Sequence, residues 1–72
     1  LDTRLYAALV DGDETLTHRL ARGRKAYVHV ARGSVTVNGQ PLGSGDALKI
    51  ERESEVVIEQ GDEAEVLLFD LE

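Results

Sequence analysis

Apolar and polar residues alternate along most of this chain with a period of two, and no stretch shows the 3.6-residue period of an amphipathic helix. Val, Ile, Leu, Thr and Tyr dominate the alternating runs, which is typical of half-buried β-strands. The pattern predicts short strands at residues 5–10, 15–20, 26–31, 35–37, 40–42, 47–50, 55–59 and 65–71.

Glycine-containing turns separate these runs at near-regular spacing. The strongest is Asn38-Gly39, because both residues tolerate positive φ and their order is that of a two-residue type I′ hairpin turn. Pro41 follows at once, and a proline within a strand favours the edge of a sheet. Short strands joined by glycine turns predict an all-β sandwich or barrel.

The pleat of each strand assigns its side chains to two faces. In the second run the apolar pair Leu16 and Leu20 places His18 on the inner side. The residues predicted to line the interior are Leu16, His18, Leu20, Ala26, Val28, Leu48, Val56 and Val66. The last strand is apolar on both sides and therefore needs a second cover. We predict an interface with another domain or another copy through Tyr27, His29, Leu67, Phe69 and Leu71.

Composition narrows the classes of function. Seventy-two residues with a net charge of −6 predict one small domain that does not bind nucleic acid. No apolar run approaches the roughly 20 residues of a membrane span, and no signal peptide is visible, so we predict no membrane partner. The absence of cysteine excludes a disulfide and suits the cytoplasm. Because the chain opens with Leu1, we expect a fragment or a processed product.

Three stretches, AYVHVARGSVTVNG, LGSGDALKI and the terminal AEVLLFDLE, resemble the C-terminal cupin of pirin-like bicupins, the bacterial pirin and quercetin 2,3-dioxygenase family. The resemblance implies a small cupin-type (RmlC-like jelly-roll) antiparallel β-barrel over residues 1–72. It implies that this chain is the C-terminal half of a bicupin. In that family, iron or another divalent metal belongs to the N-terminal cupin, which has no counterpart in this chain.

The general cupin pattern can be followed through the stretches Gly12 to Gly33 and Gly39 to Glu59. His18 matches the first histidine of the first motif, whereas the other ligand positions hold Leu20, Ala26 and Val56. One imidazole does not make a metal site. We therefore predict no catalytic residue, no cofactor and no metal ligand in this chain, with His18 as a vestigial ligand position.

The resulting hypothesis is a non-catalytic, metal-free domain that packs against and stabilises the catalytic N-terminal cupin of a pirin-like quercetin 2,3-dioxygenase. A second hypothesis is a module that binds a small flavonoid-like molecule in its lumen, with His18 fixing the polar end. A third is an enzyme whose metal is held by His18 with partners such as Glu51 or Glu53. A related alternative is a metal-dependent dioxygenase only in the context of the full-length protein. A fourth is a homodimer formed through the uncovered face.

Overall fold

The structure is a computed structural model that describes residues 2–72. Those residues form antiparallel strands and no helix, so no helix that could span a membrane occurs among them. The strands are β1 (Thr3–Val10), β2 (Leu16–Arg19), β3 (Lys25–Val37), β4 (Gln40–Leu42), β5 (Ala47–Glu51) and β6 (Glu55–Leu71).

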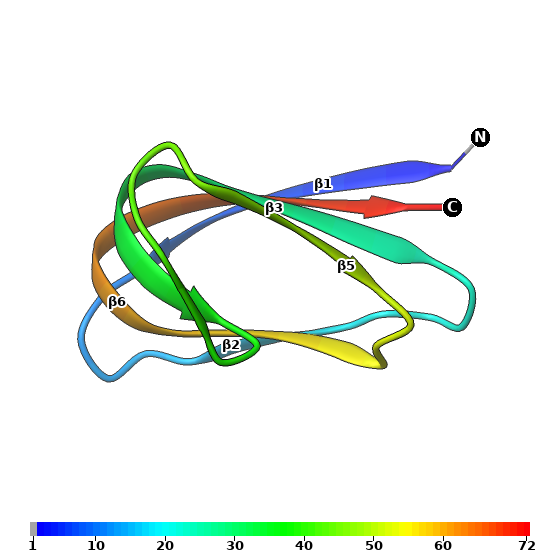
Figure 1. Cartoon of the computed structure of the whole chain (residues 1–72), viewed down its shortest axis with the longest axis horizontal. Helices are drawn as coiled ribbons and strands as arrows, with labels where there is room; N and C mark the ends of the chain where they lie inside the picture. The colour runs from blue at the N-terminus through cyan, green and yellow to red at the C-terminus, as the bar shows by residue number, and fades with distance from the viewer. Residues whose placement is uncertain (1) are drawn as a thin grey trace.

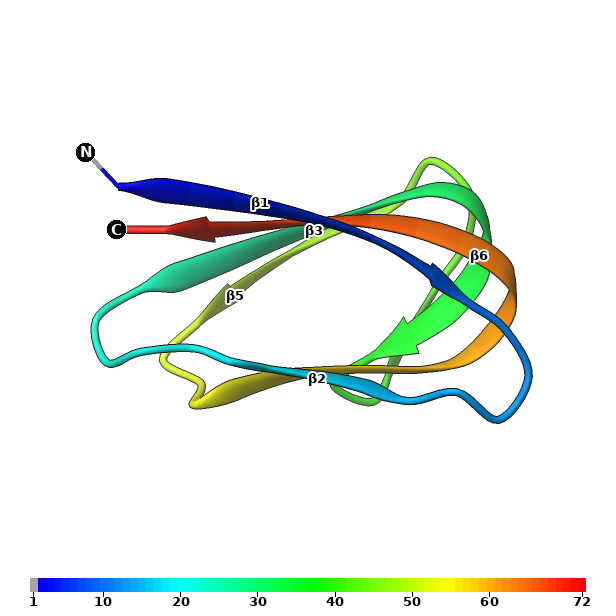
Figure 2. The same cartoon turned by 180° about the vertical axis from the view of Figure 1, so that it is seen from behind.

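The strands pair in the order β1-β6-β3-β4, with β2 also paired to β6 and β5 also paired to β3. β3 and β6 are long because each belongs to two layers, which Figures 1 and 2 show lying face to face. One layer contains β1, β5 and the halves of β3 and β6 that pair through Val28 and Leu68. The other contains β2, β4 and the halves that pair through Val37 and Ile58.

The two layers meet where β3 and β6 bend, and we call this the bend end. The register of β3 against β6 shifts there, between Val30 and Thr36. Gly33 has φ +73, and a Cβ at this position would lie 2.4 Å from the backbone oxygens of Asp62 and Glu63. A Cβ at Gly61 would lie 2.3 Å from the carbonyl oxygen of Val10. Only glycine permits this close approach of backbone to backbone.

The opposite end, which we call the open end, carries the start of β1, the end of β6 and the loop between β2 and β3 (Figure 1). Thr3 is paired with Leu71, so the chain starts and finishes on neighbouring strands. β1 and β2 are each paired with β6 and not with one another. The rolled sheet of residues 2–72 is therefore an open barrel of antiparallel strands, and the predicted all-β class is confirmed.

The predicted strands are confirmed in type, but two pairs of predicted runs merge into single strands. The runs 26–31 and 35–37 are continuous in β3, and 55–59 and 65–71 are continuous in β6. Bulges at the bend keep each strand paired where the sequence indicates a turn. Asn38 and Gly39 have φ 47 and 81, as a type I′ turn requires.

The hydrophobic core lies between the two layers and is rich in valine. Its members are Val10, Leu20, Ala26, Val28, Val30, Val35, Val37, Leu42, Ile50, Val56, Ile58, Ala64, Val66 and Leu68. Five of the residues expected to line the interior belong to it, and Leu48 packs against it. Leu16 differs, since it is 38% exposed. Leu16 lies on the inner face of β2 as predicted, but β2 is an edge strand and β1 does not pair with it, so Leu16 is left partly uncovered.

Candidate functional site

Asp70 is the one charged or polar residue that is buried among residues 2–72, with 2% of its surface exposed. It occupies the inner face of β6, two residues after Leu68, which belongs to the core. An isolated buried carboxylate is strongly unfavourable, so its partners decide what the site can do.

One partner is His18 on β2, in the facing layer. Nε2 of His18 lies 2.8 Å from Oδ2 of Asp70, and the His18 side chain is 23% exposed. An ionised carboxylate only accepts hydrogen bonds, so Nε2 carries the hydrogen and donates it. The contact joins the two layers near the open end and fixes the orientation of the imidazole.

The other partner is Arg24, in the loop that connects β2 to β3. Its Nε donates to Oδ1 of Asp70, and its Nη2 donates to the backbone oxygens of Asp70 and Asp2, each at 3.0 Å. The Arg24 side chain is 13% exposed. The guanidinium thus ties the end of β6 to the start of the chain. We call His18, Arg24 and Asp70 the polar cluster.

The charges in the polar cluster stabilise one another. Burial raises the pKa of Asp70, but the hydrogen bonds from Arg24 and His18 outweigh burial and hold this pKa below its ordinary value of 3.8. The hydrogen bond to Asp70 raises the pKa of Arg24. Asp70 is therefore an ionised acceptor with each of its carboxylate oxygens engaged.

Beside the polar cluster, Tyr6 of β1 leans over His18, with ring centroids 4.9 Å apart and ring planes at 51°. A hollow of about 150 Å³ opens between the unpaired edges of β1 and β2. Its lining is mostly apolar and consists of Tyr6, Ala8, Leu16, Thr17, His18, Ile58, Val66 and Leu68.

The described residues do not form a metal centre. Within residues 2–72, no group of three or more His, Cys, Asp or Glu side chains is arranged to hold a metal ion. His18 bonds to Asp70 rather than approaching Glu51 or Glu53. Glu51 instead pairs with Lys49 at 3.2 Å, and this hydrogen bond lowers its pKa.

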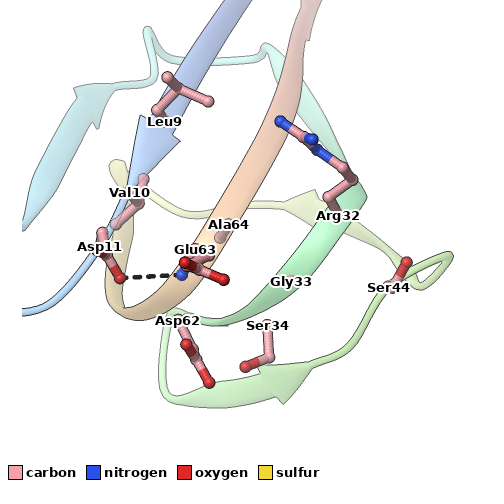
Figure 3. Close-up of a pocket in the computed structure, with 10 residues that line it drawn as sticks. All are labelled: Leu9, Val10, Asp11, Arg32, Gly33, Ser34, Ser44, Asp62, Glu63 and Ala64. Atoms are coloured by element: carbon pink, nitrogen blue, oxygen red, sulfur yellow. Dashed lines mark hydrogen bonds between the residues drawn. The ribbon is translucent and has the colours of Figure 1, made fainter.

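A larger hollow, of about 780 Å³, lies at the bend end, away from the polar cluster (Figure 3). Asp11, Asp62 and Glu63 give it an acidic lining beside Arg32. Oδ1 of Asp11 accepts from the backbone nitrogen of Glu63 at 2.9 Å, drawn as the dashed line. Asp11 therefore links the end of β1 to the bend of β6. The size of this hollow alone does not make it a functional site.

The residues expected at an interface lie together on the outer face of the layer that contains β1. Tyr27, Phe69 and Leu5 are register neighbours across β3, β6 and β1, and the Tyr27 and Phe69 rings are 6.1 Å apart. His29 and Leu67 form the next row, and Leu71 lies beside Thr3. Leu5, Leu9 and Tyr27 are 58%, 70% and 41% exposed.

Sequence reasoning missed Asp70, Arg24 and Tyr6 as members of this site. The signal for Asp70 was available, because alternation through Val66 and Leu68 places it on the inner face, as it does His18. A charged residue at a core position needs an opposite charge, which points to the nearby basic run. Nothing in the sequence selects Arg24 from Arg19, Arg22 and Lys25, because loop geometry decides which of these side chains reaches Asp70.

A family model described as the quercetinase C-terminal cupin domain matches residues 1–71. The chain belongs to this family. The predicted membership in the pirin-like cupins is confirmed.

Relatives of this quercetinase C-terminal cupin domain are larger proteins. A quercetin 2,3-dioxygenase of Escherichia coli K12 is 37% identical over 70 residues, which is 97% of this chain and 30% of that protein. A pirin-like protein of Caulobacter vibrioides is 35% identical over 69 residues, again 30% of its length. The chain thus spans less than a third of these curated relatives.

Solved structures agree on the fold. The bacterial pirin YhhW of Escherichia coli, in complex with nickel(II), superposes with a TM-score of 0.93 at 37% identity, covering 97% of this chain and 31% of that one. A cupin protein of Bacteroides fragilis, 15% identical, superposes at 0.63 over 97% of this chain and 64% of that chain, which shows the cupin fold alone.

The donors of this chain do not fit a metal ion of the kind bound by that relative. His18 and Asp70 are the inner-facing candidates; Nε2 of His18 and both carboxylate oxygens of Asp70 are engaged within the polar cluster, which leaves Nδ1 of His18 as a single nitrogen, and one imidazole does not make a metal site. A metal on Nε2 of His18 would displace its hydrogen from Asp70, and Arg24 would repel the added positive charge.

Proposed function

We propose that this domain is a non-catalytic cupin that packs against and stabilises the catalytic N-terminal cupin of a pirin-like quercetin 2,3-dioxygenase in the cytoplasm. The observation that carries the proposal is the polar cluster. His18, the one side chain at a cupin ligand position, is bonded here to Asp70, and this contact joins the two layers. In this proposal the cupin fold is retained, and the polar side chains in its interior stabilise the fold instead of binding a metal.

The outer face of β1, β3 and β6 supports the second half of the proposal. Leu5 and Tyr27 are exposed on both sides of Phe69, and Leu9 extends the patch along β1. Soluble monomers rarely expose contiguous apolar patches of this kind. The chain matches about 30% of its relatives, so the proposed cover is the cupin supplied by the rest of such a protein.

Metal content tests the non-catalytic role. The untagged chain is incubated with iron(II), nickel(II) or zinc(II), desalted, and measured by elemental mass spectrometry. We expect well below one metal per chain. Close to one metal per chain, lost in His18→Ala, would contradict the proposal.

A charge placed on the outer face tests packing. In the full-length protein that carries this domain, Leu5→Asp would bury a carboxylate at the proposed contact and lower the melting temperature of the N-terminal cupin by roughly 5 °C. Thr15→Asp is the matched control, because Thr15 is exposed and precedes β2 in the other layer. Equal melting temperatures for the two variants would contradict packing through this face.

Self-association is the alternative cover for the same face. Analytical ultracentrifugation of the chain distinguishes the two, since a stable dimer that Leu5→Asp dissociates would assign the face to a second copy.

A further inference from the structure

We propose that the hollow beside His18 binds a one-ring hydroxyaromatic molecule, a phenol, whose hydroxyl donates to Nδ1 of His18. The proposal concerns a site inside this domain and does not rest on the packing partner proposed above.

The size of the hollow sets the size of the ligand. Its volume of about 150 Å³ is that of an apolar cavity able to hold one benzene-sized molecule. Sites for drug-sized ligands measure roughly 300–1,000 Å³, so this hollow can cover one ring but not all three rings of a flavonoid. The flavonoid-like ligand considered from the sequence is thereby reduced to a single ring.

The polar cluster provides the acceptor. Because Nε2 of His18 donates its hydrogen to Asp70, Nδ1 is the ring nitrogen that keeps a lone pair when the imidazole carries one hydrogen. No residue of the described part of the chain donates to Nδ1, and the side chain is 23% exposed. The hollow thus combines a histidine whose Nδ1 has no partner among the described residues with a mostly apolar lining, which favours a hydroxyl group attached to an apolar ring.

The walls favour an aromatic ring over a saturated one. Tyr6 is already tilted against His18 at the rim, and it is 44% exposed beside Leu16 at 38%. A ring that enters between the edges of β1 and β2 would cover both side chains and contact the Tyr6 ring edge-to-face. This removes two exposed apolar groups from water, which gives the ligand its driving force.

Nuclear magnetic resonance titration of the whole chain tests the site, with phenol and benzene as probes. We expect phenol to shift amide signals around Tyr6, Ala8 and His18, and to bind about tenfold more tightly than benzene, the contribution of one hydrogen bond. In His18→Phe the two affinities should converge. Equal binding of phenol and benzene to the unmodified chain would overturn the role of His18.

Filling the hollow tests its location without disturbing the polar cluster. Ala8→Leu adds bulk to the lining, while Ala7→Leu makes the same change at the neighbouring position on the exposed outer face. We expect phenol affinity to fall at least tenfold in Ala8→Leu and to stay within twofold in Ala7→Leu. Unchanged phenol binding in a folded Ala8→Leu chain would overturn the proposal. Tighter binding of quercetin than of phenol at the same residues would overturn the size argument.

Discussion

At the bend end of the rolled sheet, backbone lies against backbone, whereas at the open end the layers are joined by polar side chains. Gly33 and Gly61 permit the first contact, and any Cβ would obstruct it. His18 and Asp70 make the second, across an interior otherwise filled by valine and leucine. The bend end thus depends on glycines, which have no side chain, whereas the open end depends on a hydrogen bond between two particular side chains. The two ends should therefore respond differently to substitution and to pH.

The largest effect is expected at the bend end. Gly33→Ala combines a left-handed backbone penalty of about 1–2 kcal/mol with an overpacking cost of about 1–3 kcal/mol. Urea unfolding followed by circular dichroism should show the midpoint fall sharply or the native state disappear. The control is Gly12→Ala, since Gly12 also has positive φ, +62, but no atom within 4 Å of its Cβ position. Equal losses in both variants would contradict the close-approach argument.

At the open end, Asp70→Asn should lower the free energy of unfolding by roughly 2 kcal/mol, because Arg24 and His18 lose a charged acceptor. The same urea titration measures it. Glu65→Gln removes the exposed Arg32–Glu65 pair, at 3.2 Å, and should change stability by less than about 1 kcal/mol. A loss in Glu65→Gln as large as that in Asp70→Asn would show that burial of the pair is not what matters.

The pH dependence of stability sharpens the same contrast. The pKa of Asp70 is depressed in the folded state, so its contribution is present above the ordinary value of 3.8 and is lost as pH falls through the folded value. The difference in urea midpoint between the unmodified chain and Asp70→Asn should narrow as pH is lowered from 6 to 2.5. Curves that stay parallel to the lowest pH would contradict an ionised, paired Asp70.

The smallest effect concerns Tyr6. The Tyr6 ring packs against His18, so Tyr6→Ala should cost about 0.5–1.5 kcal/mol, while Tyr6→Phe keeps the ring and should be nearly neutral. Thermal unfolding of the two variants provides the comparison. A larger loss in Tyr6→Phe than in Tyr6→Ala would mean that the hydroxyl, and not the ring, supports His18.

These two ends also differ in how well the sequence predicted them. Alternation and the Asn38-Gly39 turn sufficed for the all-β class and for most strand positions, because period and turn chemistry are local. The sequence predicted strand ends at the two bends, where β3 and β6 in fact continue. A glycine such as Gly33 or Gly61 is equally compatible with a turn and with a close backbone approach, and only the pairing across the sheet distinguishes these two cases.

The candidate site was half visible. His18 was placed inward by parity, but its pairing with Asp70 joins residues 52 positions apart, and Arg24 reaches them from a loop. Leu16 is exposed because β1 does not pair with β2, and the local alternation of residues does not reveal which strands pair. Features set by local sequence were therefore predicted, whereas contacts between residues far apart in the chain were not.

The shared strands also set how the chain must fold. β3 pairs with β6 along nearly its whole length, from Lys25 against Leu71 to Val37 against Ile58, so the central ladder joins segments far apart in sequence. Conformational entropy is lost when β3 and β6 are brought together, before the hydrogen bonds between them form. Domains dominated by such long-range contacts fold in milliseconds to seconds. We expect a single slow refolding phase in which neither layer gains protection from hydrogen exchange ahead of the other.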